Sequence, residues 1–267
     1  MKNNSESLGS FTAVWDAFRN ADMSHFPISK AINPEGGLDV VIVSQILKEL
    51  EDVNLPKDPA KASEMASVMA KVRESLDEVK GLTEYQDQKA TRLLTIVSFL
   101  SALAGGLLTI FSKAYPFQTY LIGSAINWQA VFVIAAYALF GVFVVLAISG
   151  ALVVFYATKT RFKWPKEAEA PRSRLFYAGI VSAPPHAWAK AFVTGSGPNK
   201  EFVSATELQF SYTKDYILES YLVAAKVADK LRYLMPAQNI LYLTVKVMLA
   251  WVLVVGLVAL AVQGAPS

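Results

Sequence analysis

The sequence predicts an all-α integral membrane protein whose three transmembrane helices continue from the long helices of a cytoplasmic domain. Three observations predict this class. The composition is 54% hydrophobic and only 18% charged, which is too apolar for an ordinary soluble domain. Three runs of membrane length carry almost no charge. In addition, a charged helical segment enters the first run with no loop between them.

Each apolar run is long enough to cross a bilayer. Leu93–Phe111 has 19 residues and no charge, Gln129–Ala157 has 29 and no charge, and Ile240–Val262 has 23 with Lys246 as its one charge. At about 1.5 Å per residue, each run crosses a hydrocarbon core of about 30 Å. Buried core helices are the alternative, but little other sequence is available to cover them.

A helical segment is predicted over residues 1–59. Phe11, Val14, Trp15 and Phe18 fall on one face of a short amphipathic helix over residues 10–20. This helix could dock on the cytoplasmic domain or lie on the membrane, although one Arg and one Asp give little electrostatic support to the second interpretation. A second helix is predicted from Val40 to Leu50.

A single rod is predicted from Ala60 to Lys113. The stretch contains no proline, and its apolar residues recur at helical spacing. A helix of this length measures about 80 Å. A tilt or rotation of the cytoplasmic end of this helix would therefore be transmitted along it into the bilayer. The apolar positions before the membrane include Met65, Val72, Leu76 and Val79.

The later elements follow the same plan. The second span should continue to about Trp164, and residues 175–192 are broken by Gly179, Pro184 and Pro185, which favours a turn over a fourth span. A helix over 200–235 leads to Pro236 and the third span. The predicted boundaries are an N-terminal cytoplasmic segment 1–59, a helix 60–91, spans 92–112, 129–157 and 237–263, an external loop 113–128, a basic cytoplasmic region 158–236 and an external tail 264–267.

The distribution of charge predicts the orientation. Residues 158–174 hold six Lys and Arg, whereas residues 112–128 hold only Lys113. Basic flanks stay in the cytoplasm, so we expect a cytoplasmic N-terminus and an external C-terminus in a plasma membrane. Aromatic residues in the external loop fit an interfacial belt.

Two cytoplasmic segments of opposite charge should attract each other. Residues 1–91 carry 10 basic and 15 acidic side chains, and residues 158–236 carry 12 basic and 7 acidic. The entry motif Asp87, Lys89 and Arg92 has two interpretations. It is either a solvated turn at the headgroups or a polar cluster that pairs with the late helix, where Lys226, Asp229, Lys230 and Arg232 are candidates.

Signals for catalysis are nearly absent. The chain has no cysteine, its two histidines are far apart in sequence, and no phosphate-binding glycine loop appears. We therefore expect no enzymatic activity, no cofactor, no metal and no nucleic-acid partner.

The spans argue against a coupled transporter, because none contains Asp, Glu, Arg or His in its interior. Lys246 either snorkels to the interface or has a pore-lining or gating role. Ser98, Ala102 and Gly106, with Gly105 beside them, form small-residue faces suited to helix packing. Three spans are too few to enclose a wide pore, so we expect a homo-oligomer.

Three segments resemble one family. "YQDQKATRLLTIVSFLSAL" (85–103), "RLFYAGIVSA" (174–183) and the late helix "YILESYLVAAKVADKLRYLMPAQNILYL" (216–243) resemble the Pycsar membrane effectors, with matching order over about residues 83–262. The departures are Tyr177-Ala178 in place of an aromatic pair and the order of residues 230–233.

The resemblance implies an antiphage defence effector in the bacterial inner membrane. A cyclic pyrimidine nucleotide, made by a partner cyclase, would be sensed, and the effector would then impair the membrane and arrest growth. The alternatives are a non-catalytic scaffold or sensor subunit, and, third, a channel or transporter. The lipid bilayer is the expected partner surface. We expect a bound cyclic nucleotide to contact Lys89, Arg92, Arg174, Lys226 and Lys230.

Overall fold

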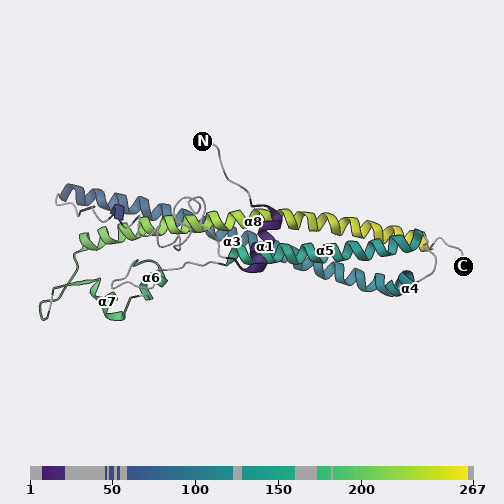
Figure 1. Cartoon of the computed structure of the whole chain (residues 1–267). Helices are drawn as coiled ribbons and strands as arrows, with labels where there is room; N and C mark the ends of the chain where they lie inside the picture. The colour runs from purple at the N-terminus through teal and green to yellow at the C-terminus, as the bar shows by residue number, and fades with distance from the viewer. Residues whose placement is uncertain are drawn as a thin grey trace. The chain divides into compact units, whose positions relative to one another are not determined.

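The computed structural model describes residues 8–21, 46, 48–50, 53–54, 59–122, 128–159, 173–181, 183–195 and 197–263. This part of the chain is helical apart from one two-stranded sheet, as the sequence predicted, and three of its helices are long and apolar enough to cross a membrane. The elements, labelled in Figure 1, are α1 (Ser10–Arg19), α3 (Pro59–Ala114), α4 (Phe117–Ile122), α5 (Trp128–Thr158), α6 (Tyr177–Val181), α7 (Pro185–Lys190), β1 (Val193–Thr194), β2 (Glu201–Phe202) and α8 (Ala205–Gln263).

Two helices run without interruption from charged sequence into apolar sequence. Helix α3 has 56 residues and α8 has 59. The continuous rod predicted from the proline-free stretch is thereby confirmed. Helix α8 also contains Pro236, which supplies no backbone N–H for the usual bond to the preceding turn. The helix continues through this position rather than beginning there.

The chain divides into two compact units, which are described separately. The first comprises residues 1–22, 87–159 and 230–267. Its long helices bury side chains at seven-residue spacing: Ala90, Ala104 and Phe111 are the buried members of one such column on α3, in which Val97 is half-buried. A seven-residue repeat is slightly shorter than two α-helical turns, so helices that keep it wind around one another with a left-handed twist. The column on α8 consists of Lys230, Ala237, Thr244, Trp251 and Val258, and the column on α5 of Ala136, Phe143, Gly150 and Ala157.

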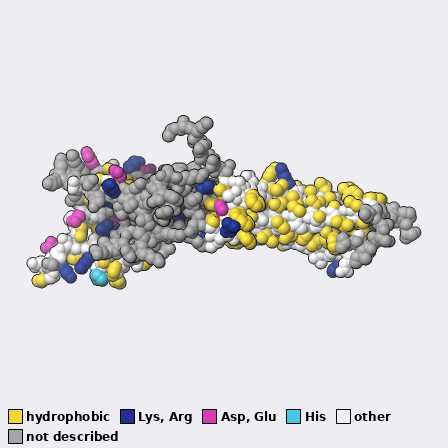
Figure 2. Space-filling model, viewed as in Figure 1, with side chains coloured by type: hydrophobic (Ala, Val, Ile, Leu, Met, Phe, Trp, Pro, Cys, Tyr) yellow, Lys and Arg dark blue, Asp and Glu magenta, His cyan; other side chains and the backbone are white. Residues whose placement is uncertain are grey.

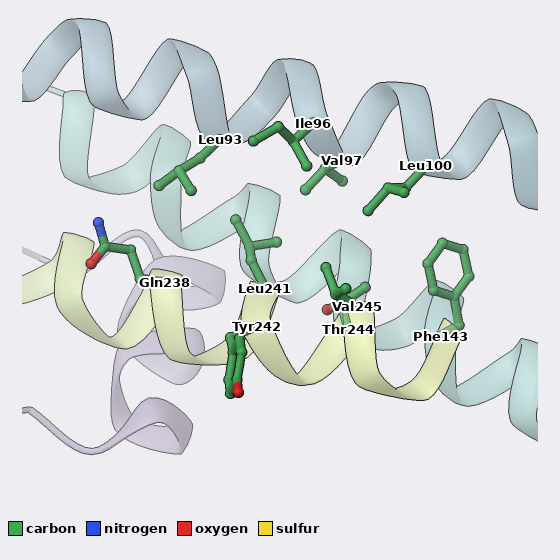
Figure 3. Close-up of a pocket in the computed structure, with 10 residues that line it drawn as sticks. All are labelled: Leu93, Ile96, Val97, Leu100, Phe143, Gln238, Leu241, Tyr242, Thr244 and Val245. Carbon is green, nitrogen blue, oxygen red and sulfur yellow. The ribbon is translucent and has the colours of Figure 1, made fainter. Parts of the chain in front are cut away.

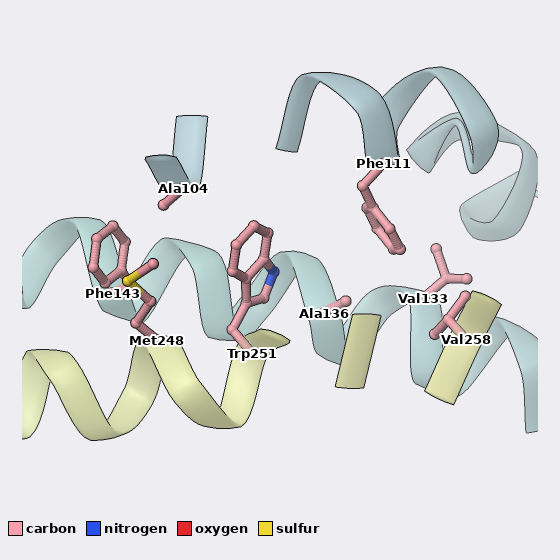
Figure 4. Packing of buried hydrophobic residues seen from close by; sticks show 8 residues of the cluster. All are labelled: Ala104, Phe111, Val133, Ala136, Phe143, Met248, Trp251 and Val258. Carbon is pink, nitrogen blue, oxygen red and sulfur yellow. The ribbon is translucent and has the colours of Figure 1, made fainter. Parts of the chain in front are cut away.

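The core of this unit lies between the three long helices (Figure 4). Trp251 of α8 packs against Phe140 of α5 with 5.3 Å between ring centroids. Phe143 of α5 and Ala104 of α3 belong to the same buried cluster. The outer surface is also apolar, and Figure 2 shows hydrophobic side chains over much of the visible face of this unit. Exposed Val145, Ile148, Leu253 and similar residues fit contact with lipid.

Aromatic residues close the end of the bundle where α3 stops. The Tyr137 hydroxyl donates to the Tyr115 carbonyl over 2.9 Å. The ring of Phe117 on α4 meets the Tyr137 ring edge-on, with 5.1 Å between centroids. Aromatic residues were expected near this end, and part of the segment expected as a loop, 113–128, is helical.

The second unit comprises residues 23–86 and 160–229. Leu76 of α3 and Leu218 and Leu222 of α8 are buried in it. Helices α6 and α7 fall within the segment 175–192, where a turn rather than a fourth span was expected. Ser173 is fully buried and its hydroxyl accepts hydrogen bonds from the backbone N–H groups of Leu175 and Phe176.

Two predicted boundaries are wrong. The late helix was expected from residue 200, but β2 pairs with β1 and places Phe202 opposite Val193, and α8 begins only at Ala205. The reason is a capping motif, in which the Ser204 hydroxyl accepts a hydrogen bond from the Glu207 N–H. Helix α5 ends at Thr158 rather than near residue 164. The helix predicted over 40–50 lies mostly outside the described residues.

Candidate functional site

An ion pair joins α3 to α8 at the end of the first unit. The Lys230 ammonium lies 2.8 Å and 2.9 Å from the two carboxylate oxygens of Asp87. The Lys230 side chain is 5% exposed and that of Asp87 is 49% exposed. Lys230 occupies the first position of the buried column on α8, so a cation sits where the rest of the column is uncharged. The interpretation of Asp87 as part of a polar cluster that pairs with the late helix is thus confirmed for this residue.

A second polar contact ties α1 to the same stretch of α8. The Tyr233 hydroxyl donates to an Asp16 carboxylate oxygen over 3.1 Å. Burial raises the pKa of Tyr233 above its usual range, so the phenol keeps the proton that it donates. The Tyr156 ring of α5 meets the Tyr233 ring edge-on, with 4.8 Å between centroids. Asp16, Asp87, Tyr156, Lys230 and Tyr233 are referred to below as the boundary cluster.

The boundary cluster connects four helices at a place where α8 is weakened. Pro236 follows Tyr233 by less than one turn, and it withdraws one backbone hydrogen bond from α8. Proline is a common cause of bends in helices. Side-chain contacts therefore fix α8 just before the point at which it can bend most easily.

A family comparison identifies the protein class. The model of the Pycsar effector protein domain, PycTM, matches residues 71–260. The chain belongs to this family. It is therefore an antiphage defence effector and a multi-pass membrane protein. No curated protein and no solved structure matches the chain.

In this Pycsar effector, three of the five expected ligand-binding residues belong to the first unit. Lys230 is paired with Asp87, Lys89 is half-buried on α3, and Arg92 is exposed on the same helix. Lys89 and Arg92 follow Asp87 by two and five residues, so their side chains leave α3 on sides other than the one that bears Asp87. An anion that approached Lys230 would compete with the Asp87 carboxylate.

The other two expected residues belong to the second unit. Arg174 donates from its backbone N–H and from its guanidinium to the same oxygen of Asp215, over 3.1 Å and 3.2 Å. Lys226 is buried on α8. Arg174, like Lys230, therefore already has a carboxylate partner.

The second unit also contains a buried carboxyl group that the sequence analysis did not single out. Glu219 lies one turn after Asp215 on α8 and is 6% exposed. Burial raises the pKa of Glu219 to about 7, and the Asp215 charge acts in the same direction while Lys80 opposes it. Burial likewise raises the pKa of Asp215, against the effect of Arg174. Within the described residues, no group of His, Asp and Glu could hold a metal ion.

The remaining predicted residues lie on the surface of the spans. Lys246 is exposed, and its ammonium lies 4.4 Å from the centroid of the Tyr242 ring, one turn earlier in α8. The side chain therefore points toward the N-terminal end of the helix, as snorkelling in that direction requires. Ser98, Ala102 and Gly106 are exposed in the single chain, and a methyl group added at Gly105 or Gly106 would meet nothing within 4 Å.

An apolar groove of about 210 Å³ lies between α3 and α8 in the first unit (Figure 3). Leu93, Val97 and Leu100 of α3 face Leu241 of α8, and Phe143 of α5 lies at one end. The lining offers no cationic group. This groove suits an aliphatic chain and is poorly suited to an anionic nucleotide.

Asp16, Tyr156, Tyr233, Asp215 and Glu219 were missed by the sequence analysis. The Tyr233 to Asp16 contact joins residues 217 positions apart, so the local sequence around either residue does not predict it. The spacing of Asp215 and Glu219 on a buried helix face was the one available signal, because two carboxyl groups one turn apart are neighbours on a helix.

Proposed function

We propose that this effector responds to a cyclic pyrimidine nucleotide by impairing the bacterial inner membrane, which arrests growth. The observation that carries the proposal is the position of the Asp87–Lys230 pair. It lies within the Pycsar effector domain, on the two helices that continue from charged sequence into the spans. The proposed activity requires binding and movement rather than catalysis, and no cofactor or metal.

The ligand is proposed to act by competition for cations. A cyclic nucleotide carries a phosphate, and lysine ammonium groups bind phosphate readily. Lys230, Lys89 and Arg92 supply positive charge at the first unit's boundary. A phosphate that paired with Lys230 would displace Asp87, whose side chain is exposed enough to become hydrated.

Loss of the Asp87–Lys230 pair would allow the register of α3 relative to α8 to change. A charged residue at one core position of a helical bundle fixes register at a cost in stability. Once Asp87 leaves, the fixed register is lost just before Pro236, and the spans can shift. Because three spans cannot enclose a wide pore, the membrane-impairing state is proposed to be a homo-oligomer. The exposed small-residue face of Ser98, Ala102 and Gly106 is suited to such packing.

The test compares two variants that should respond in opposite directions. Bacteria express the chain with or without a panel of nucleotide cyclases, and membrane potential and dye entry are recorded. The wild type should depolarise only with a pyrimidine nucleotide cyclase. Lys230→Met should need at least ten times the cyclase dose for the same response, because methionine offers no cation to the phosphate and packs in the otherwise uncharged column without a partner. Asp87→Asn leaves the buried Lys230 ammonium without its carboxylate and should depolarise cells without any cyclase.

The matched control is Lys71→Met, which breaks the exposed Lys71–Glu74 pair of 2.7 Å on the same helix. It should behave as the wild type, since exposed pairs contribute little. A wild type that stays silent with every cyclase, although present in the membrane, would favour the scaffold alternative. A normal response from Lys230→Met would disprove the role of Lys230.

A further inference from the structure

We infer that α1 is an interfacial helix, and that its face bearing Phe11, Trp15 and Phe18 lies in the headgroup region of the bilayer crossed by α3, α5 and α8. Helix α1 precedes the residues matched by the family domain, 71–260, and the proposed function assigns it no contact with lipid. The inference rests on the faces of the helix, on the place where α1 is attached, and on the charges near it.

Helix α1 has three faces, each roughly a third of a turn from the next at 3.6 residues per turn. The first face packs against the protein, because Ala13 and Ala17 are buried. The second face carries the polar residues Thr12 and Asp16. The third face carries Phe11, Trp15 and Phe18, which are 83%, 45% and 72% exposed.

The attachment of α1 places it beside the ends of the apolar helices. Asp16 accepts the hydrogen bond from Tyr233, and the Ala21 carbonyl accepts one from the Tyr156 hydroxyl over 2.7 Å. The Lys159 ammonium donates to the side-chain oxygen of Asn20 over 2.5 Å. Lys159 directly follows the last residue of α5, so these contacts hold α1 at the level where the second span ends.

The direction of α1 fits a position in the interface. Figure 1 shows α1 crossing the bundle next to α5 instead of running along it. A helix that crosses the bundle at the end of the spans lies close to the plane of the membrane surface. Phe155, in the last turn of α5, is exposed, so an apolar side chain of the second span faces outward near the end of α5 to which α1 is attached.

The charges on α1 suit an anionic membrane surface. Asp16 is turned toward the protein by its bond from Tyr233, whereas Arg19 is exposed. The Arg19 guanidinium lies 4.3 Å from the centroid of the Trp15 ring. A tryptophan with an arginine over it is suited to the headgroup layer, where the ring is partly in hydrocarbon and the cation meets phosphate.

The absence of cysteine from the chain makes the test direct. A nitroxide label is attached to Phe18→Cys in the full chain, reconstituted in phosphatidylcholine–phosphatidylglycerol vesicles. Accessibility to oxygen, which concentrates in lipid, is compared with accessibility to a water-soluble nickel complex. Thr12→Cys is the matched control on the polar face of α1, Ile148→Cys is the reference for lipid and Lys71→Cys the reference for water.

The label at position 18 should be accessible to oxygen and at least threefold less accessible to nickel than the label at position 12. Nickel access at position 18 equal to that at position 71 would place the face in water and overturn the inference. Exclusion of both reagents would also overturn it, because the face would then be covered by protein, as in contact with a second copy. If Phe18→Cys unfolds the chain, quenching of Trp15 fluorescence by brominated lipids tests the same contact with lipid. Trp15→Phe is the blank, and absence of quenching at Trp15 would overturn the inference.

Discussion

Lys230 places an ammonium group in the buried column of α8. Every later member of that column is uncharged. Removing a lysine from water costs several kcal/mol unless a partner compensates, and Asp87 is that partner. Because Asp87 is half exposed, the pair is easier to open than one buried on both sides. This asymmetry makes the contact suitable as a switch in the proposed function.

At the same scale, Glu219 predicts a dependence of stability on pH. Its folded-state pKa of about 7 lies above the ordinary value of 4.5. Between these values the folded chain holds a proton that the unfolded chain has lost, so stability should fall as the pH rises from about 4.5 to 7, by roughly 3 kcal/mol in total. Asp215, whose pKa is also raised, should add to the decline at its lower end.

Glu219→Gln should remove the larger part of this decline, because its buried amide cannot ionise. Thermal unfolding in detergent at pH 5 and pH 8 measures the effect. The variant should be more stable than the wild type at pH 8 and nearly equal to it at pH 5. An exposed carboxyl on the other long helix, Glu74→Gln, is the control. A wild type whose stability is the same at both pH values would contradict the burial argument.

Residue-level prediction from the sequence succeeded where charge and helix periodicity agreed. Asp87 ends an acidic segment and Lys230 lies in a basic one, so their attraction could be expected. The Tyr233–Asp16 bond could not be, because it depends on how α1 crosses the bundle. Burial of Glu219 depends likewise on which face of α8 packs inward, and that face is defined only once the neighbouring helices are in place.

At the scale of elements, the seven-residue columns explain how the spans approach one another. Gly150 belongs to the column on α5, and a Cβ there would overlap Leu241 Cδ2 and lie 2.9 Å from its Cγ. Gly141 lies on the same helix, yet a Cβ there would meet nothing within 4 Å. The first glycine permits close approach of α5 and α8, whereas the second has no such role.

Gly150→Ala should therefore destabilise the bundle by about 1–3 kcal/mol, the usual cost of overpacking. Gly141→Ala should be neutral or slightly stabilising, since alanine is the better helix former. Thermal unfolding of both variants in the same detergent gives the comparison. In a Leu241→Ala background, Gly150→Ala should cost less stability than it does in the wild type, because the smaller side chain removes the overlap. Equal stability of the two glycine variants would show that the helices do not depend on this approach.

The long helices were predictable because periodicity and the absence of proline act over many residues. The ends of the helices were less predictable from the sequence. The start of α8 depends on the Ser204 cap and on pairing of β1 with β2, and these local interactions prevailed over helix propensity from residue 200. The end of α5 coincides with Tyr156 and Lys159 turning toward α1, a contact between segments 135 or more residues apart.

At the scale of the whole molecule, composition and apolar runs were sufficient to predict a three-span membrane protein. The arrangement of the five expected ligand-binding residues was not predictable in the same way. Opposite net charge draws two segments together but does not specify which side chains pair. The structure assigns Lys230 to Asp87 and Arg174 to Asp215, each within its own unit.

The orientation of the chain is the last prediction, and the proposed function depends on it. Six Lys and Arg residues in 158–174, against Lys113 alone in 112–128, should keep residues 1–91 and 158–236 in the cytoplasm. In intact spheroplasts, a membrane-impermeant maleimide should label Lys113→Cys at once and Lys71→Cys only after lysis. The cysteine-free wild type is the blank. The reverse labelling pattern would place Lys230 and the boundary cluster at the outer face, where a nucleotide made in the cytoplasm could not reach them.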